Sequence, residues 1–80
     1  MKFIKKVPHI AVDISFYEWN QKVIVKFEWN NLEQTYKVGL LDLSSKEEVN
    51  AALSDDFIAR VLDRFETMQE EWESALGLVL

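Results

Sequence analysis

The sequence contains no cysteine, one proline, two glycines and no long apolar run. Without cysteine there is no disulfide, thiolate nucleophile or thiolate metal site, so stability must come from packing. The longest apolar stretches are far shorter than the roughly 20 residues that cross a bilayer. We therefore expect a protein without a membrane span, compatible with a reducing cytoplasm.

Residue types that perform catalysis are also scarce. His9 is the only histidine, which excludes a metal site built from several imidazoles and leaves no spare general base. The neighbouring carboxylates at 55–56 and 70–73 fit a helix cap and a solvated helix face. Neither glycine lies in a phosphate-binding loop. We predict a protein that is not an enzyme and uses no cofactor or metal.

The length of the chain predicts how many domains it forms, and its charge indicates which partners it disfavours. Eighty residues with 49% hydrophobic content predict one folded domain over 1–80. Residues 1–43 carry a net charge of +1 and residues 44–80 a net charge of −6. The acidic half repels phosphate backbones, so we expect no direct binding to nucleic acid. An acidic mimic of nucleic acid is an alternative, and its charges would be those of Glu66, Glu70, Glu71 and Glu73.

Alternating apolar and polar residues predict strands at 10–17, 23–29 and 34–38. A shorter strand at 2–6 is expected at an edge of the sheet, because Pro8 has no N–H to donate to a central ladder. Residues 1–43 therefore predict an antiparallel sheet of three to four strands.

The register of this sheet can also be predicted. If 20–21 and 30–31 are two-residue loops, Phe16 faces Val25 and Ile14 faces Phe27, so apolar residues meet on one face. By the same rule Val12 faces Trp29. The opposite face then receives three mixed rows, which are Tyr17, Ile24 and Lys37; Ser15, Lys26 and Thr35; and Asp13, Glu28 and Glu33. Neither loop has the preferred Asn-Gly, so longer loops with a shifted register are an alternative.

Residues 44–77 predict two helices. A capping box, either Ser44 with Glu47 or Ser45 with Glu48, begins a short helix that ends near 53. Residues 54–56 supply the next N-cap, and Gly77 is placed to end that helix. The long helix has apolar residues at three- and four-residue spacing, and we expect its stripe to pack on the sheet: Ile58, Val61, Leu62, Phe65, Met68, Trp72, Ala75 and Leu76. The predicted fold is α+β, with both helices on one face of the sheet.

Two surfaces are candidates for binding a partner. The helix-free face of the sheet presents Tyr17, Ile24, Lys26 and Glu28, a mixture of aromatic, aliphatic and charged side chains that is typical of protein interfaces. An ordinary solvated sheet face is the alternative. The apolar tail at 78–80, Leu78, Val79 and Leu80, either packs back or mediates self-association, to which Trp72 would contribute.

Several segments, taken in order and spacing, resemble the small phage-encoded anti-CRISPR proteins that inhibit type I-F CRISPR–Cas. They are Met1-Lys2-Phe3-Ile4-Lys5, Ile14-x-x-Tyr17-Glu18, Lys22 before an aliphatic residue, Glu28, Val38-Gly39-x-x-Asp42-Leu43-x-Ser45-x-Glu47 and, more weakly, Arg60. The chain departs from that family where Lys6 replaces an interface tyrosine, in a shorter segment before the second strand, in a longer loop around Asn30, and in lacking a glycine-rich link before the last helix.

The resemblance implies a four-stranded antiparallel sheet beneath two antiparallel helices. It also implies a phage or mobile-element protein that acts in the cytoplasm of a bacterial host. There it would bind the Cas backbone subunits of the surveillance complex and prevent target DNA from pairing with the guide. The family's interface tyrosine and glutamate correspond to Tyr17 and Glu28.

Overall fold

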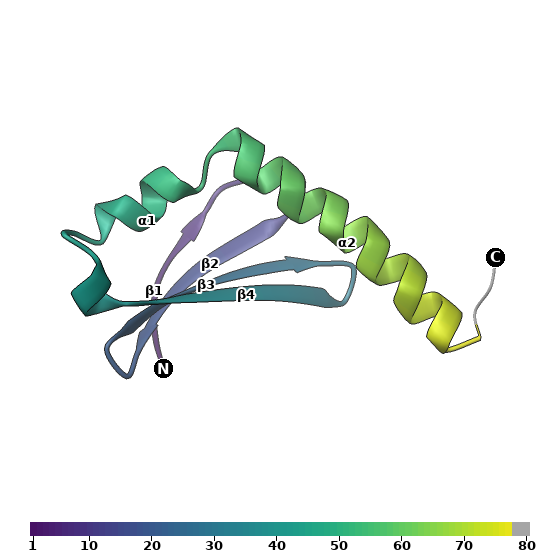
Figure 1. The fold of residues 1–80 in the computed structure, drawn as a ribbon, viewed down its shortest axis with the longest axis horizontal. Helices are drawn as coiled ribbons and strands as arrows, with labels where there is room; N and C mark the ends of the chain where they lie inside the picture. The colour runs from purple at the N-terminus through teal and green to yellow at the C-terminus, as the bar shows by residue number, and fades with distance from the viewer. Residues whose placement is uncertain (78–80) are drawn as a thin grey trace.

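The computed structural model describes residues 1–77 and has a four-stranded sheet covered on one side by two helices (Figure 1). The strands come first in the chain and the helices follow. The elements are β1 (Lys2–Val7), β2 (Asp13–Trp19), β3 (Lys22–Trp29), β4 (Leu32–Gly39), the 3₁₀ turn η1 (Leu40–Asp42), α1 (Glu47–Ala52) and α2 (Asp55–Ala75). This confirms the α+β fold predicted from the sequence.

The sheet is an antiparallel meander in which neighbours in sequence are neighbours in space, in the order β1-β2-β3-β4. Phe16 pairs with Val25 and Ile14 with Phe27, as predicted, and Val25 also pairs with Tyr36 of β4. Both hairpins turn through two residues, and all four of these have left-handed backbone, with φ between 47° and 63° at Asn20, Gln21, Asn30 and Asn31. That geometry matches the twist of the strands, so the predicted register holds without glycine in either turn.

The segment before β2 differs from the prediction. The strand begins at Asp13 rather than at residue 10, and the predicted pairing of Val12 with Trp29 does not form, although Val12 is buried. Ile10 is fully exposed. The N–H of Ala11 donates to Nδ1 of His9 over 3.1 Å, and this local bond holds a bend where the alternating pattern alone predicted a strand.

α2 begins at its predicted cap, Ser54, whereas the residue before α1 is Lys46, whose side chain makes no capping hydrogen bond. The predicted capping box at the start of α1 forms only in part. Glu48 accepts hydrogen bonds from the backbone N–H of Ser44 and Ser45, and Oγ of Ser45 accepts from the N–H of Glu47, which selects the Ser45 and Glu48 register. These two N–H donors also lower the pKa of Glu48 below its ordinary value. Oγ of Ser54 caps α2 by accepting from the N–H of Phe57. Gly77, with φ of 77°, ends it as predicted.

The core lies between the sheet and the helices. It contains strand residues of one face together with Val49 from α1 and Ile58, Val61 and Phe65 from α2; the strand members are Ile14, Phe16, Val23, Val25 and Phe27. Figure 1 shows α2 continuing beyond the end of the sheet. Trp72 lies in this projecting part and is 56% exposed, so the prediction that the whole apolar stripe packs on the sheet is wrong for its last turns.

A polar network ties β4 to α2. Gln34 is buried, and its Nε2 donates to the carbonyl oxygen of Val61 over 2.9 Å. Its Oε1 accepts from the hydroxyl of Tyr36 and from Nε of Arg64, and Arg64 also donates to the Tyr36 oxygen. Because a buried amide without partners is costly, this network fixes the position of α2 over the last strand.

Candidate protein-binding face

The sheet leaves one face without a helix, and the strand register decides which residues lie on it. The three predicted rows across β2, β3 and β4 are present as pairs in the ladder. β1 adds Phe3 beside Tyr17 and Lys6 beside Ser15, with a bulge between Phe3 and Lys5. Tyr17, Lys26 and Glu28 therefore lie on one face as predicted, together with Phe3, which sequence reasoning did not include.

Tyr17 is held between two neighbours. Its ring meets Phe3 edge to face with 5.7 Å between the ring centroids, and Nζ of Lys26 lies 5.2 Å from the centroid of the Tyr17 ring. Both arrangements are favourable for an aromatic ring and a cation. The half-buried ring is therefore positioned before any partner arrives, which reduces the entropy lost on binding.

Ile24 differs from its predicted role. It sits in the same row as Tyr17 and Lys37, but it is only 1% exposed, although no helix covers this face. The surrounding side chains of the sheet cover it instead. Ile24 is therefore too buried to contact a partner directly and supports the residues around it.

An acidic row closes one end of the face. Asp13, Glu28 and Glu33 lie directly opposite one another on three adjacent strands. Nζ of Lys26 lies 3.5 Å from Oε1 of Glu33, whereas Glu28 is exposed and makes no salt bridge within residues 1–77. Like charges placed opposite each other disfavour the sheet slightly, so this row does not owe its presence to stability. It suits a basic partner surface.

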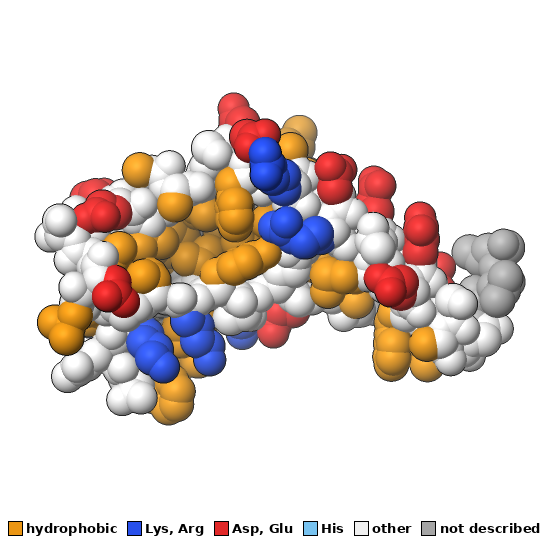
Figure 2. Space-filling view, in the orientation of Figure 1, with side chains coloured by type: hydrophobic (Ala, Val, Ile, Leu, Met, Phe, Trp, Pro, Cys, Tyr) orange, Lys and Arg blue, Asp and Glu red, His pale blue; other side chains and the backbone are white. Residues whose placement is uncertain are grey.

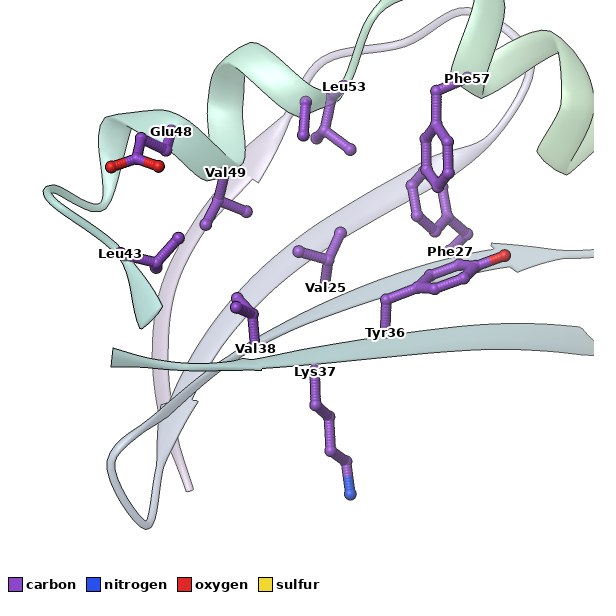
Figure 3. A pocket seen from close by; sticks show the side chains of 11 residues that line it. Val25, Phe27, Tyr36, Lys37, Val38, Leu43, Glu48, Val49, Leu53 and Phe57 are labelled. Atoms are coloured by element: carbon purple, nitrogen blue, oxygen red, sulfur yellow. The ribbon is translucent and has the colours of Figure 1, made fainter. Parts of the chain in front are cut away.

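The helix-covered side contains an apolar groove that the sequence pattern does not predict. Its volume is about 360 Å³, and it lies between β4, α1 and the start of α2 (Figure 3). Its walls are mainly Val25, Phe27, Tyr36, Val38, Leu43, Val49, Leu53 and Phe57. Figure 3 shows Lys37 pointing away from it, on the other side of the sheet. In Figure 2 apolar side chains are visible in the hollow beneath the helices.

The acidic alternative has its own surface. Glu66, Glu70 and Glu71 are exposed on α2, while Glu73 is half-buried and accepts a hydrogen bond from Nε2 of Gln69 over 2.8 Å. Figure 2 shows acidic side chains spaced along the outer side of this helix. These charges lie on the helix layer, so they can be changed without touching the helix-free face.

Three further features of the chain concern membrane spans, metal ligands and the C-terminal tail. No helix among residues 1–77 has both the length and the apolar character needed to cross a membrane. Within the same residues, no three or more metal-binding side chains gather closely enough to hold an ion. The predicted apolar tail, Leu78 to Leu80, lies outside the described residues.

Comparison with known proteins adds no relative. No protein-family model, curated protein or solved structure matches the chain.

Proposed function

We propose that this protein is a non-enzymatic inhibitor that binds the Cas backbone subunits of a type I-F CRISPR surveillance complex through its helix-free face. The observation that carries the proposal is the cluster of Tyr17, Lys26 and Glu28 on a sheet face that neither α1 nor α2 covers. The identity of the partner comes from the sequence resemblance. The order of four strands followed by two helices agrees with the fold that this resemblance implies. The helices depart from it, because α1 and α2 follow each other end to end along the sheet and do not lie antiparallel (Figure 1).

Each residue has a distinct role in the proposed complex. Glu28, exposed and without an ion pair among residues 1–77, meets a lysine on the surface that receives target DNA. Tyr17, already held by Phe3 and Lys26, supplies aromatic area at the centre of the contact. The bound protein then occupies the place of the target strand, and DNA fails to pair with the guide.

The direct test mixes purified protein with a purified type I-F surveillance complex. We expect co-elution in size-exclusion chromatography and loss of target-DNA binding in a gel-shift assay. Tyr17→Ala and Glu28→Lys should each weaken inhibition at least about tenfold, the scale of an interface hot spot. Glu70→Lys is the matched control, because it makes the same charge change on the helix layer. Absence of co-elution together with unchanged DNA binding would refute the proposal.

The exposed acids of α2 favour a second candidate, a mimic of nucleic acid. Reversing the charges of Glu66, Glu70 and Glu71 together separates the two. If this triple variant loses inhibition while Tyr17→Ala and Glu28→Lys retain it, the acidic mimic is the better account. The opposite result favours the helix-free face.

Self-association through the end of α2 is a third candidate, supported by the exposure of Trp72. Light scattering on the full chain, on Trp72→Ala and on a chain shortened at 77 tests it. A monomer in all three samples would remove this candidate.

A further inference from the structure

The two edges of the sheet are built differently. β1 is interrupted by a bulge between Phe3 and Lys5 and carries Lys2, Lys5 and Lys6, features that discourage pairing with another chain. β4 is the other edge, and its eight residues pair with β3 without a bulge or a proline. Such an edge is a template for another strand.

In an antiparallel ladder the backbone N–H and C=O groups of successive residues are directed alternately toward and away from the paired strand, and this alternation applies to β4. The residues that flank a two-residue hairpin loop form a hydrogen-bonded pair, so Leu32 bonds to Trp29 and every second residue after it also faces β3. The N–H of Leu40 donates to the carbonyl oxygen of Gln21. This bond fits the same alternation, because Leu40 lies an even number of residues after Leu32. The N–H and C=O groups directed away from β3 are therefore those of Glu33, Thr35, Lys37 and Gly39.

The apolar groove lies beside this same edge. Tyr36 and Val38 of β4 form part of its wall, with Leu43, Val49 and Phe57 on the helix side (Figure 3). A strand added to β4 would place alternate side chains on the groove side and on the helix-free side. A fitting partner needs apolar residues at the first set of positions and charges that complement Glu33 and Lys37 at the second.

We propose that the partner for this edge is a second copy of the chain, paired antiparallel through β4 about a two-fold axis at Thr35. This register places Glu33 opposite Lys37 of the second copy, twice, on the helix-free side. It places Leu32 of one copy beside Val38 of the other, next to the groove. The residues that meet are also those whose backbone N–H and C=O groups are directed away from β3, which are Glu33, Thr35 and Lys37.

Two antiparallel copies of β4 thus bring opposite charges together, bring apolar side chains together, and align the backbone groups that are directed outward. The dimer would have one eight-stranded sheet with two helix-free faces joined side by side. An interface of one strand pair is small, so we expect a dissociation constant in the micromolar range.

Sedimentation equilibrium across a concentration series tests the proposal. We expect a monomer–dimer equilibrium for the native chain. Glu33→Lys and Lys37→Glu should each weaken the dimer about tenfold or more, because each places like charges opposite each other twice. Glu66→Lys, the control, changes the net charge as Glu33→Lys does but lies on α2, and it should leave the dissociation constant unchanged.

Exchange of the charges gives the decisive measurement. The double variant Glu33→Lys/Lys37→Glu should recover the dimer, and an equimolar mixture of the two single variants should form a heterodimer. Thr35→Pro removes an outward N–H without removing a bond to β3, so it should abolish dimerisation while circular dichroism remains native. A native chain that stays monomeric at several hundred micromolar, or a dimer insensitive to all these changes, would overturn the proposal. Failure of the dimer proposal leaves the proposed binding to the surveillance complex unaffected, because that binding is tested separately through Tyr17 and Glu28.

Discussion

The two faces of the sheet achieve burial by different means. On the covered side, Phe27 is fully buried beneath two helices and touches the rings of Tyr36 and Phe57 at centroid distances of 5.8 and 6.0 Å. On the helix-free side, Ile24 is almost as buried, but the side chains that cover it belong to its own sheet. Burial therefore does not require a second layer. The cover on the helix-free side is free to rearrange or to contact a partner.

The largest expected effect belongs to the covered face. Phe27→Ala should lower the free energy of unfolding by about 4 kcal/mol, because the two-layer core cannot collapse around the lost ring. Urea denaturation followed by circular dichroism measures it. A loss below about 1 kcal/mol would show that the helices do not form a packed layer on this face.

A smaller effect is expected at Ile24, the buried aliphatic residue of the helix-free face. Ile24→Ala should cost about 2 kcal/mol, at the low end for a buried aliphatic residue, because the neighbouring side chains and water can fill the space. The same denaturation experiment compares it with Phe27→Ala. Equal losses from both substitutions would contradict the difference between a sealed core and a face covered by its own side chains.

The smallest effect is a dependence on pH at the start of α1. The pKa of Glu48 is lowered in the folded protein below its ordinary value of 4.5 by the N–H groups of Ser44 and Ser45. Its contribution to stability is therefore complete above about pH 5 and is lost as the pH falls through the folded-state pKa. Glu48→Gln should be less stable than the native chain at pH 7, and the gap should narrow below pH 4.5. Denaturation at a series of pH values checks this, and a gap that widens on acidification would contradict it.

Most of the sheet could be predicted from the sequence because strand parity is a strong constraint. Two-residue loops at Asn20-Gln21 and Asn30-Asn31 determine the face on which every residue of β2, β3 and β4 lies. The beginning of β2 was missed because a local hydrogen bond from Ala11 to His9 outweighed the alternating pattern. Trp72 was misplaced because helical spacing does not reveal where the sheet beneath a helix ends.

Strand parity also predicted the face of the candidate site, but it did not predict the burial of each residue. Parity placed Tyr17, Lys26 and Glu28 together, but it gives only the side on which a residue lies and not what covers it, which is why Ile24 was expected at the surface. The apolar groove was missed for a different reason. Its walls come from β3, β4 and the segment 43–57, and their separation depends on how η1 and the two helices turn.

The meander order described above also has a consequence for how the chain folds. Every strand pairs only with its neighbour in the sequence, so each pairing closes a short stretch of chain and has a small entropic cost. Such a topology has a low contact order and favours fast folding. During synthesis the whole sheet emerges before either helix, and its apolar face must wait for residues 47–75 to cover it. That face is therefore exposed until α2, which supplies most of the helical core residues, has been made.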